Sequence, residues 1–225
     1  MIAVWSAMLI NPSVAKRFLT TIISMRIEKG RSTTRDIAKR LAITRSESSK
    51  VLSGLERMGL VKKRGSMICP TPLGRGKVKI VMTGGVFDIV HVGHIATLRA
   101  ARKLGDMLVV VVARDTNVRR TKGKDPVNGE SMRLGIVRNL KPVDAAILGN
   151  DEDIYKVVER IGPDIIALGY DQNHNEEAIA KELLRRGLRA KVKRLKVQVP
   201  GAKTSNILSH VGYESTSKKC LKGNI

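Results

Sequence analysis

Aromatic residues are scarce in this chain of 225 residues, which has two Phe, three Tyr and one Trp. Proteins that bind single-stranded nucleic acid often stack the bases on aromatic side chains, so the composition argues against that mode of binding. Cysteine is also scarce, because Cys69 and Cys220 are the only two and lie far apart, in no metal-ligand spacing. The sequence therefore argues against a disulfide framework and is typical of a reducing compartment, the cytoplasm.

Long apolar runs are missing as well. The opening stretch MIAVWSAMLI is apolar, but it has no basic residues in front of it and is too short to span a bilayer. We interpret it as a helix that packs on the rest of the chain, or as residues that precede the true start. No membrane partner is expected.

Acidic residues are few beside the basic ones: 20 Asp and Glu stand against 42 Lys and Arg, a formal net charge of +22. Residues 1–76 hold 15 basic and 4 acidic residues, and residues 77–225 hold 27 and 16, so each part carries +11. The first part is shorter and therefore the more densely charged. This charge indicates polyanionic partners, namely nucleotide phosphates and nucleic acid. For residues 77–225, a surface rich in Lys and Arg like that of thermophilic proteins is the alternative.

Residues 1–76 have the pattern of a small helical domain that ends in a hairpin. Three helices are expected, one over residues 14–30, one capped by Ser32 or Thr33, and one capped by Thr44 and closed by Gly59. Two short strands around Arg64–Gly65 and a basic linker, Gly74–Gly76, follow.

The string LERMGLVKKRGSMICPTPLGRG resembles the end of the recognition helix and the wing of winged helix-turn-helix regulators. The resemblance implies duplex DNA as a partner, and we expect a homodimer. Candidate base contacts at the start of the recognition helix are Thr44, Arg45, Ser46, Ser48, Ser49 and Lys50. Candidate phosphate contacts on the wing are Lys62, Lys63 and Arg64. A docking or dimerisation domain with a solvated basic face is the alternative.

Residues 77–211 alternate short apolar runs with helical patterns, and a tail over 212–225 follows. The runs lie at 78–83, 107–113, 145–149 and 164–169, with a basic strand at 190–197. The helical patterns lie at 92–104, 130–140, 152–161 and 175–187. Continuous apolar runs suit parallel strands that are buried on both faces. The alternation therefore predicts an α/β fold with a doubly wound, Rossmann-like sheet.

The stretch TGGVFDIVHVGH follows the first of these strands and opens a helix. Gly84 and Gly85 permit a tight turn. His91 and His94 flank Gly93 at the helix start, where backbone N–H groups and the helix dipole favour an anion. Two imidazoles there can donate hydrogen bonds to a phosphate whose charge grows in the transition state. The alternative is a pair of capping or core histidines.

This context resembles the nucleotidyltransferase superfamily that carries an HxGH motif. The resemblance implies attack by an acceptor phosphate on the α-phosphate of a nucleoside triphosphate, release of pyrophosphate, and Mg²⁺ with the triphosphate. It implies that His91 and His94 are catalytic. The implied nucleotide contacts are Val86, Phe87, His91, Val92, Gly93, His94, Lys122, Lys124, Arg133, Asp171, Thr204 and Ser205. Asp88 and Asp115 fall in the acceptor or metal region.

Several of these residues are expected on strand ends and loops. Arg114 and Asp115 end the second strand. Arg119, Arg120, Lys122 and Lys124 lie on a Gly-containing stretch that we expect to be a loop closing over phosphates, with a solvated charge run as the alternative. Thr204 and Ser205 resemble the superfamily's late hydroxyl pair, with simple helix capping as the alternative. The basic residue often found before that pair falls at Gln198; either Arg194 or Lys196 substitutes for it from the neighbouring strand, or the affinity for the triphosphate is weaker.

Residues 78–207 resemble the archaeal FAD synthases in particular, through VVVARD, TKGKDPV, LKPVDAAILG, PDIIALGYDQ and EEAIAKELLRRGL. That resemblance implies ATP and FMN as substrates and FAD as product. Bacterial glycerol-3-phosphate cytidylyltransferases share the core motif and are the alternative within the same chemistry. A regulator that only senses a nucleotide or flavin is the alternative of another class. VFD in place of the usual TFD, and HVGH in place of HPGH, are departures from the family pattern.

Overall fold

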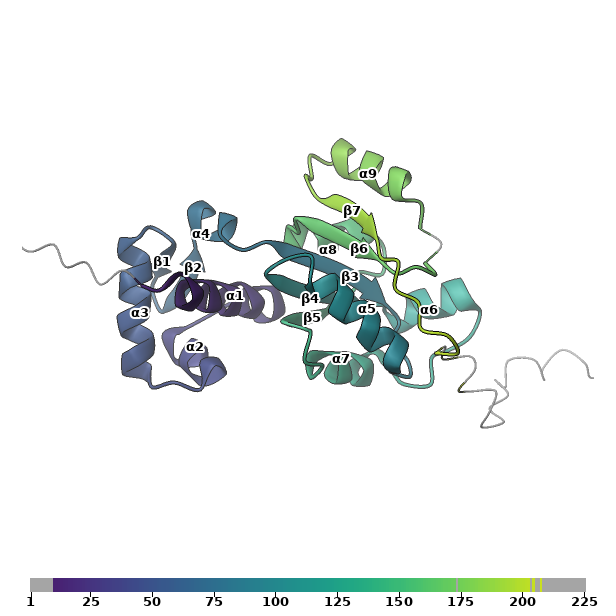
Figure 1. The fold of residues 1–225 in the computed structure, drawn as a ribbon, viewed down its shortest axis with the longest axis horizontal. Helices are drawn as coiled ribbons and strands as arrows, with labels where there is room; N and C mark the ends of the chain where they lie inside the picture. The colour runs from purple at the N-terminus through teal and green to yellow at the C-terminus, as the bar shows by residue number, and fades with distance from the viewer. Residues whose placement is uncertain (1–9, 173, 203, 205–206, 208–225) are drawn as a thin grey trace, which may run out of the picture. The chain divides into compact units, whose positions relative to one another are not determined.

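The computed structural model describes residues 10–172, 174–202, 204 and 207. The chain divides into two compact units, Met1–Lys79 and Ile80–Ile225 (Figure 1). The boundary expected from the sequence, after Gly76, lies close to this division. Among the described residues, no helix is both long and apolar enough to cross a membrane.

The first unit consists of helices and one hairpin. Its helices are α1 (Pro12–Lys29), α2 (Thr34–Leu41) and α3 (Arg45–Arg57), followed by strands β1 (Val61–Arg64) and β2 (Met67–Pro70) and a short helix α4 (Pro72–Gly76). The two strands are antiparallel. Leu19, Ile22, Ile37, Leu55 and Ile68 are almost fully buried and form the core of this unit.

Side-chain caps decide where α2 and α3 begin. Thr33, rather than Ser32, caps α2 by accepting the backbone N–H of Asp36. Ser32 is instead buried, and its hydroxyl donates to the carbonyl of Ile68. Thr44 caps α3 as expected and forms a reciprocal capping pair with Glu47. Such caps satisfy backbone N–H groups that have no partner within the helix, and they leave a signature in the sequence.

The expected linker at Gly74–Gly76 is wrong, because these residues end α4. Thr71 caps this helix, and Gly74 is buried. A Cβ atom on Gly74 would lie 1.9 Å from the carbonyl oxygen of Leu60. The glycine is therefore present because two backbone segments approach each other closely, and not because the chain must be flexible there.

The second unit is built on a five-stranded sheet with the strand order β5-β4-β3-β6-β7, and every pair in it is parallel. The strands are β3 (Ile80–Gly85), β4 (Met107–Val112), β5 (Ala145–Leu148), β6 (Ile165–Leu168) and β7 (Lys191–Arg194). The expected α/β fold with a Rossmann-like parallel sheet is confirmed. The strand order reverses beside β3, and ligands of such sheets bind at the carboxyl ends of the strands near that point.

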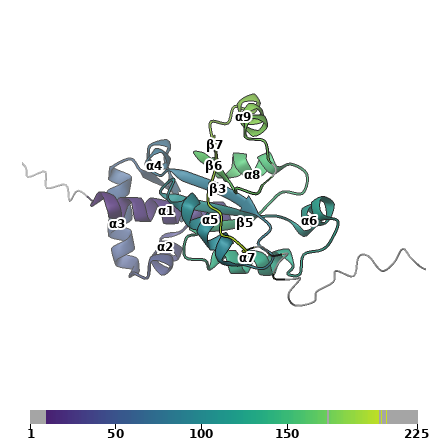
Figure 2. The ribbon, with the colours of Figure 1, turned by 45° about the vertical axis from the view of Figure 1, so that its right-hand side comes forward.

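Helices connect the strands and cover both faces of the sheet (Figures 1 and 2). They are α5 (Val92–Arg102), α6 (Asp115–Lys122), α7 (Glu130–Arg138), α8 (Ile154–Ile161) and α9 (Glu176–Arg185). Leu98 of α5 and Val137 of α7 pack in one buried cluster with Val81 and Val110 of the sheet, so α5 and α7 share a face. Because parallel crossovers are right-handed, the reversal of strand order places α8 and α9 on the other face.

The sequence did not predict α6, where we expected a loop from Arg119 to Lys124. This helix is polar on almost every side and buries only Val118. A helix without an apolar stripe gives no periodic signal in the sequence. Gly123, with a φ of 65°, ends it in the left-handed conformation.

Candidate active site

The turn after β3 is held by Phe87, whose side chain packs back onto the strand end. Phe87 is buried and has a φ of 53°, a conformation that costs a non-glycine residue about 1–3 kcal/mol. Its ring lies so close to Gly85 that a Cβ atom there would be 2.9 Å from a ring carbon. Gly85 is therefore needed to make room for Phe87. The sequence had suggested a tight turn as its role.

His91 and His94 meet at the start of α5, as the sequence predicts. His91 caps the helix, and its Nδ1 accepts the backbone N–H of Gly93 at 3.2 Å. The Nδ1 of His94 accepts the backbone N–H of His91 at 3.4 Å. The ring centroids are 4.0 Å apart. Because both Nδ1 atoms accept, a neutral imidazole at either position carries its proton on Nε2, where it can be donated to a ligand.

Burial keeps both imidazoles neutral. It lowers the pKa of His94 to about 4, with help from the neighbouring His91 and from Lys122, while the charge of Asp171 acts in the opposite direction. Burial also lowers the pKa of His91, again against Asp171. The pair therefore offers two neutral N–H donors at the positive end of a helix near pH 7.

The loop after β6 brings Asp171 to this pair. Gln172 joins two strand ends, because its Nε2 donates to Gly84 O at 2.8 Å and its Oε1 accepts from Gly169 N at 3.0 Å. Asp171 itself is exposed, and its charge acts on both histidines. The sequence singled out Asp171 but missed Gln172, for which a position beside Asp171 was the only signal.

Arg194 fastens the same loop. Its guanidinium donates to the carbonyl oxygens of Gly169, Gln172 and His174 and pairs with Glu176 at 2.9 Å. The expectation that Arg194 could substitute for a triphosphate-binding cation does not fit these contacts, because four of its five N–H donors are already used and its charge is paired with Glu176. Lys196 is exposed and stays available for that role.

The chain returns over the histidines near its C-terminal end. Thr204 donates to Ile89 O at 3.4 Å. A Cβ atom on Gly93 would lie 3.0 Å from the His91 ring and 3.1 Å from Ala202 O. The segment that carries Ala202 thus passes over Gly93, which explains why this position has no side chain. Ser205 lies outside the described residues, so its predicted contact stays a prediction.

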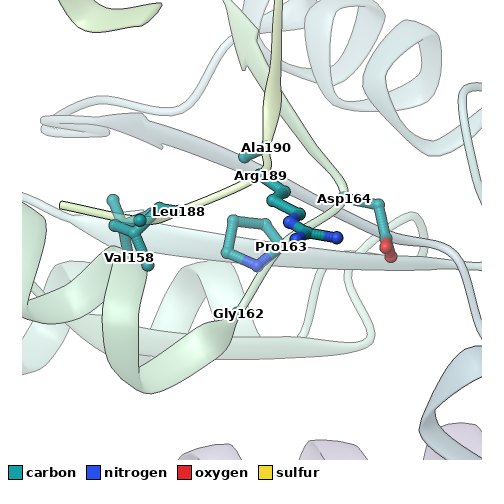
Figure 3. A pocket seen from close by; sticks show the side chains of 8 residues that line it. Val158, Gly162, Pro163, Asp164, Leu188, Arg189 and Ala190 are labelled. Carbon is teal, nitrogen blue, oxygen red and sulfur yellow. The ribbon is translucent and has the colours of Figure 1, made fainter. Parts of the chain in front are cut away.

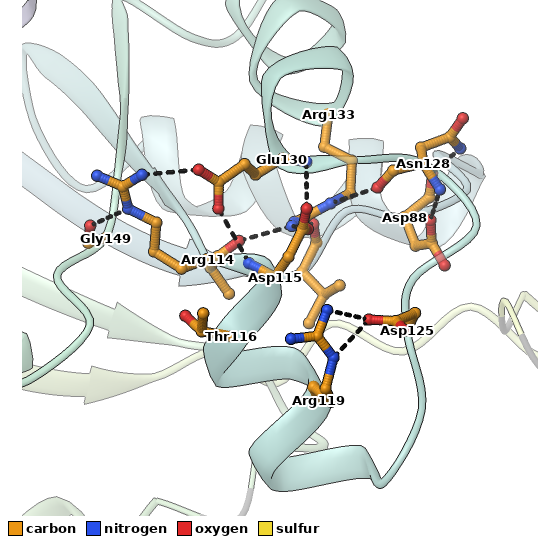
Figure 4. A network of polar contacts seen from close by, with 12 residues as sticks. Asp88, Arg114, Asp115, Thr116, Arg119, Asp125, Asn128, Glu130, Arg133 and Gly149 are labelled. Carbon is orange, nitrogen blue, oxygen red and sulfur yellow. Dashed lines mark hydrogen bonds and ion pairs between the residues drawn. The ribbon is translucent and has the colours of Figure 1, made fainter. Parts of the chain in front are cut away.

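Arg133 does not face the site, although the sequence placed it among the nucleotide contacts. Its side chain is completely buried, and its four hydrogen bonds go to Asn128 O, Val86 O, Ala113 O and Asp115 Oδ1 (Figure 4). Burial of Asp115 would raise its pKa, but the bonds from Arg133 and from the Glu130 N–H outweigh that effect and hold the pKa below its usual range. The hydrogen bonds of Arg133 thus go to protein atoms and not toward a ligand.

Asp88 and Asp115 were expected in an acceptor or metal region, but both carboxylates accept hydrogen bonds from backbone N–H groups. The two carboxylate oxygens of Asp88 accept the N–H groups of Val127 and Asn128, at 2.9 and 2.8 Å. Asp115 binds Arg133 and the N–H of Glu130. Glu130 in turn binds Arg114, whose Nε reaches Gly149 O (Figure 4). These acids therefore order the loops around the site.

The basic residues of α6, together with Lys124 just after it, divide into two groups. Arg119 pairs with Asp125 at 2.6 Å, and Arg120 donates to the side-chain oxygen of Asn117. Lys122 and Lys124 are exposed, and the charge of Lys122 acts on His94. Val92, between the histidines, is two-thirds exposed. Lys122 and Val92 are therefore the predicted contacts that remain open to a ligand beside the histidines.

A hollow of about 230 Å³ lies elsewhere in the second unit (Figure 3). Asp164 and Ala190, which line it, immediately precede β6 and β7. The hollow is therefore at the amino ends of these strands, opposite the edge that carries the histidines. Asp164 accepts the backbone N–H of Ile80 at 2.6 Å, a structural use of its carboxylate.

The candidate DNA contacts of the first unit behave differently from one another. Ser48 is buried, and its hydroxyl donates a hydrogen bond to Thr34 O. The expectation that Ser48 contacts a base edge is therefore not met. The Thr44 hydroxyl is used in the capping pair with Glu47. The remaining candidates are exposed; they are Arg45, Ser46, Ser49, Lys50, Lys62, Lys63 and Arg64.

Comparison with known proteins gives one family match and a set of relatives. A family described as cytidylyltransferase-like matches residues 82–210. The FAD synthase of Aciduliprofundum boonei is 57% identical over 116 residues, which cover 52% of this chain and 77% of that protein. The FAD synthase of Thermococcus sibiricus is 43% identical over 138 residues, covering 60% and 93%. A crystal structure of a lipopolysaccharide core biosynthesis protein from Thermoplasma volcanium is 45% identical, with a TM-score of 0.52, over 54% of this chain and 99% of that one.

Proposed function

The chain belongs to the cytidylyltransferase-like family, and we propose that it transfers AMP from ATP to FMN, giving FAD and pyrophosphate. The observation that carries the chemistry is the pair of Nε2–H donors of His91 and His94 at the start of α5. The observation that carries the substrates is the similarity to several archaeal FAD synthases. Because the reaction consumes ATP, the proposed location is the cytoplasm.

The proposed reaction is a displacement at the α-phosphorus of ATP. An oxygen of the FMN phosphate forms a bond to that phosphorus, the bond to the bridging oxygen of the β-phosphate breaks, and pyrophosphate takes the electron pair. Negative charge grows on the α-phosphate oxygens as this happens. Hydrogen bonds from His91 and His94 become stronger with that charge and so lower the barrier. A neutral imidazole suits this role because it donates a hydrogen bond without giving up its proton.

The groups near the histidines fit the remaining parts of the nucleotide. We propose that Asp171 contacts the nucleoside end, and that Lys122, Lys124, Lys196 and the hydroxyls of Thr204 and Ser205 contact phosphates. Lys122 is supported by its electrostatic action on His94, and Thr204 by its position on the segment that returns over the motif.

A divalent cation, Mg²⁺ in the first instance, is proposed to accompany ATP. The described residues contain no group of three His, Cys, Asp or Glu that could hold a metal ion, and Asp88 and Asp115 are occupied by backbone N–H groups and Arg133. The protein side chains in that range therefore do not fit a resident metal. Mg²⁺ commonly binds mainly through substrate phosphates, where it neutralises their charge.

The substrate pair is tested by supplying ATP or CTP, each with FMN or glycerol 3-phosphate, and measuring pyrophosphate. We expect pyrophosphate only from ATP with FMN, together with FAD in the same reaction. Protein with His94→Ala, purified in parallel, controls for contaminating enzymes. Turnover restricted to CTP with glycerol 3-phosphate would overturn the assignment of the substrates but leave the chemistry. Absence of turnover with every pair, together with ligand-dependent binding to an operator, would favour a regulator.

For the first unit we propose duplex DNA as partner, bound by a winged helix that pairs as a homodimer. A hollow of about 410 Å³ between the helix pair and the hairpin is the observation that favours this. Arg35, Arg45 and Lys63 line it, and none of these three side chains forms an ion pair with an acidic residue in the described part of the chain. The nearby acids Asp36 and Glu47 are engaged with Thr33 and Thr44. The hollow therefore presents three cations to a phosphate backbone.

DNA binding is tested with the full chain and labelled duplexes in an anisotropy titration over a series of salt concentrations. Each phosphate contact contributes a slope of about −0.9 to the dependence of log affinity on log salt. Arg35→Ala and Lys63→Ala should each make that slope shallower by about one, on all sequences alike. Arg17→Ala, in the second turn of α1 and not among the residues that line the hollow, is the matched control. Affinity that does not respond to salt would contradict the proposal and favour a docking module; sedimentation of the same samples tests the dimer.

A further inference from the structure

Arg133 is the one charged residue among the described side chains that is completely buried. Four of its five N–H donors are used within the protein. Its Nε donates to Asn128 O at 2.9 Å, its Nη1 to Val86 O at 2.5 Å, and its Nη2 to Ala113 O at 2.8 Å and Asp115 Oδ1 at 2.6 Å. A guanidinium presents its donors in a fixed plane, so these four acceptors are held in one geometry.

The three carbonyls belong to three different segments that border the site. Val86 follows β3 and precedes Phe87. Ala113 follows β4, and its N–H binds Gly85 O at 2.9 Å. Asn128 lies in the loop that the carboxylate of Asp88 holds. Arg133, on α7, therefore joins the ends of two strands to the loop before its own helix, as Figure 4 shows for its bonds to Asn128 and Asp115.

The segment that contains Val86 also contains Phe87, whose ring contacts His94. The Phe87 ring lies 5.2 Å from the His94 ring, between centroids, at an angle of 50°. Phe87 also has the positive φ of 53°, which an L-residue keeps only where the surroundings hold it. The bond from Arg133 to Val86 O fixes the peptide just before this residue. Arg133 is therefore connected to His94 through the carbonyl of Val86 and the ring of Phe87.

We propose that Arg133 is a positioning residue for the histidine pair, acting through Val86 and Phe87, and that it makes no contact with the nucleotide. This rests on the proposed function of the pair. The guanidinium holds the turn in the conformation in which Phe87 supports His94, and so sets the direction of the His94 Nε2–H. Because Arg133 is completely buried and four of its donors are used inside the protein, its contribution is to the geometry of the reacting state rather than to affinity for ATP.

Arg133→Lys separates the two roles, because lysine keeps the charge but cannot donate to all of these acceptors at once. A misplaced catalytic group costs on the order of 10²-fold in rate, so we expect kcat to fall by roughly 10- to 10²-fold while KM for ATP changes by less than about threefold. A nucleotide ligand would behave in the opposite way, with KM raised and kcat kept. Arg138→Lys, the same change on the same helix at a residue that binds Ala146 O, is the control and should leave both constants unchanged.

A second readout does not depend on turnover. NMR titration of the apo protein follows the His94 pKa, which His91, Lys122 and Asp171 also influence. If Arg133→Lys releases Phe87, His94 becomes more hydrated and its pKa rises toward 6.5, whereas Arg138→Lys leaves it in place. Phe87→Leu, which keeps Arg133, should reproduce both the rise in the His94 pKa and the loss of kcat. This variant tests the proposal if the arginine variant does not fold. A raised KM with an unchanged His94 pKa, or unchanged kcat, would overturn the proposal. Should the protein prove inactive with ATP and FMN, the titration still decides whether Arg133 positions His94.

Discussion

His91 donates its backbone N–H to the Nδ1 of His94, so the first histidine fixes the tautomer of the second. His91 is fixed in the same way by the N–H of Gly93. The HxGH spacing is what makes both bonds possible, because it places the second imidazole on the first turn of α5, beside the capping residue. The helix start thus uses its own unpaired N–H groups to orient both Nε2 donors.

Replacing either histidine with alanine should lower kcat far more than it raises KM for ATP. The loss should be roughly 10²–10³-fold, the usual cost of removing one donor to charge that develops in the transition state. His94→Gln should recover part of the rate, since its amide can donate from a similar position. Steady-state kinetics on purified variants measure this, with His174→Ala as control. If kcat stayed at the wild-type value, that histidine would not belong to the site.

Stability should fall as the pH drops from about 6.5 to about 4. The folded pKa of His94 is lowered from 6.5 to about 4 by burial and its neighbours, so within this window the unfolded chain binds a proton that the folded chain does not. The free energy of unfolding therefore rises with pH across the window and is constant, for this group, below it. Urea titrations at pH 4.5 and pH 7 measure the difference. His94→Gln should reduce it, and an identical difference in wild type and variant would refute the assignment.

Two glycines of the second unit should respond in opposite ways to alanine. At Gly85 a Cβ atom would lie 2.9 Å from the Phe87 ring, and such overpacking typically costs about 1–3 kcal/mol. At Gly135, on α7, a Cβ atom would meet nothing within 4 Å, and alanine should stabilise the helix by about 0.5–1 kcal/mol. Thermal denaturation of the two variants gives the comparison. Equal effects would mean that Phe87 does not occupy the space beside Gly85.

The strands and the histidine motif were predictable because local patterns encode them. Four apolar runs and one basic stretch gave the five parallel strands to within two or three residues, and the motif context predicted that His91 and His94 lie together at the start of α5. Arg133 was not predictable, because an arginine on an amphipathic helix looks the same in sequence whether it is buried or exposed; its role depends on carbonyls from three other segments. Ser48 likewise looked like a base contact, although packing turns it inward. Helix α6 has no apolar stripe, so nothing in its composition marked it.

Arg194 should affect binding of ATP rather than the chemical step. It holds the carbonyls of Gly169, Gln172 and His174, and Asp171, the proposed nucleoside contact, lies between them. Arg194→Lys should therefore raise KM for ATP several-fold, with a smaller change in kcat, and Asp171→Asn should do the same. Lys193→Met, at the neighbouring position of β7, is the matched control. An increase in KM with Asp171→Asn but none with Arg194→Lys would show that the loop keeps its shape without the arginine.

The most direct test of the central claim follows the α-phosphate itself. The wild-type protein is incubated with FMN, Mg²⁺ and ATP that is radiolabelled at either the α- or the γ-phosphate, and the products are separated. Transfer of AMP predicts that the α-label appears in FAD and the γ-label in pyrophosphate, and that His94→Ala slows the formation of both labelled products by roughly 10²–10³-fold. Label from the γ-position in a flavin product, or no labelled FAD under conditions where CTP and glycerol 3-phosphate react, would contradict it.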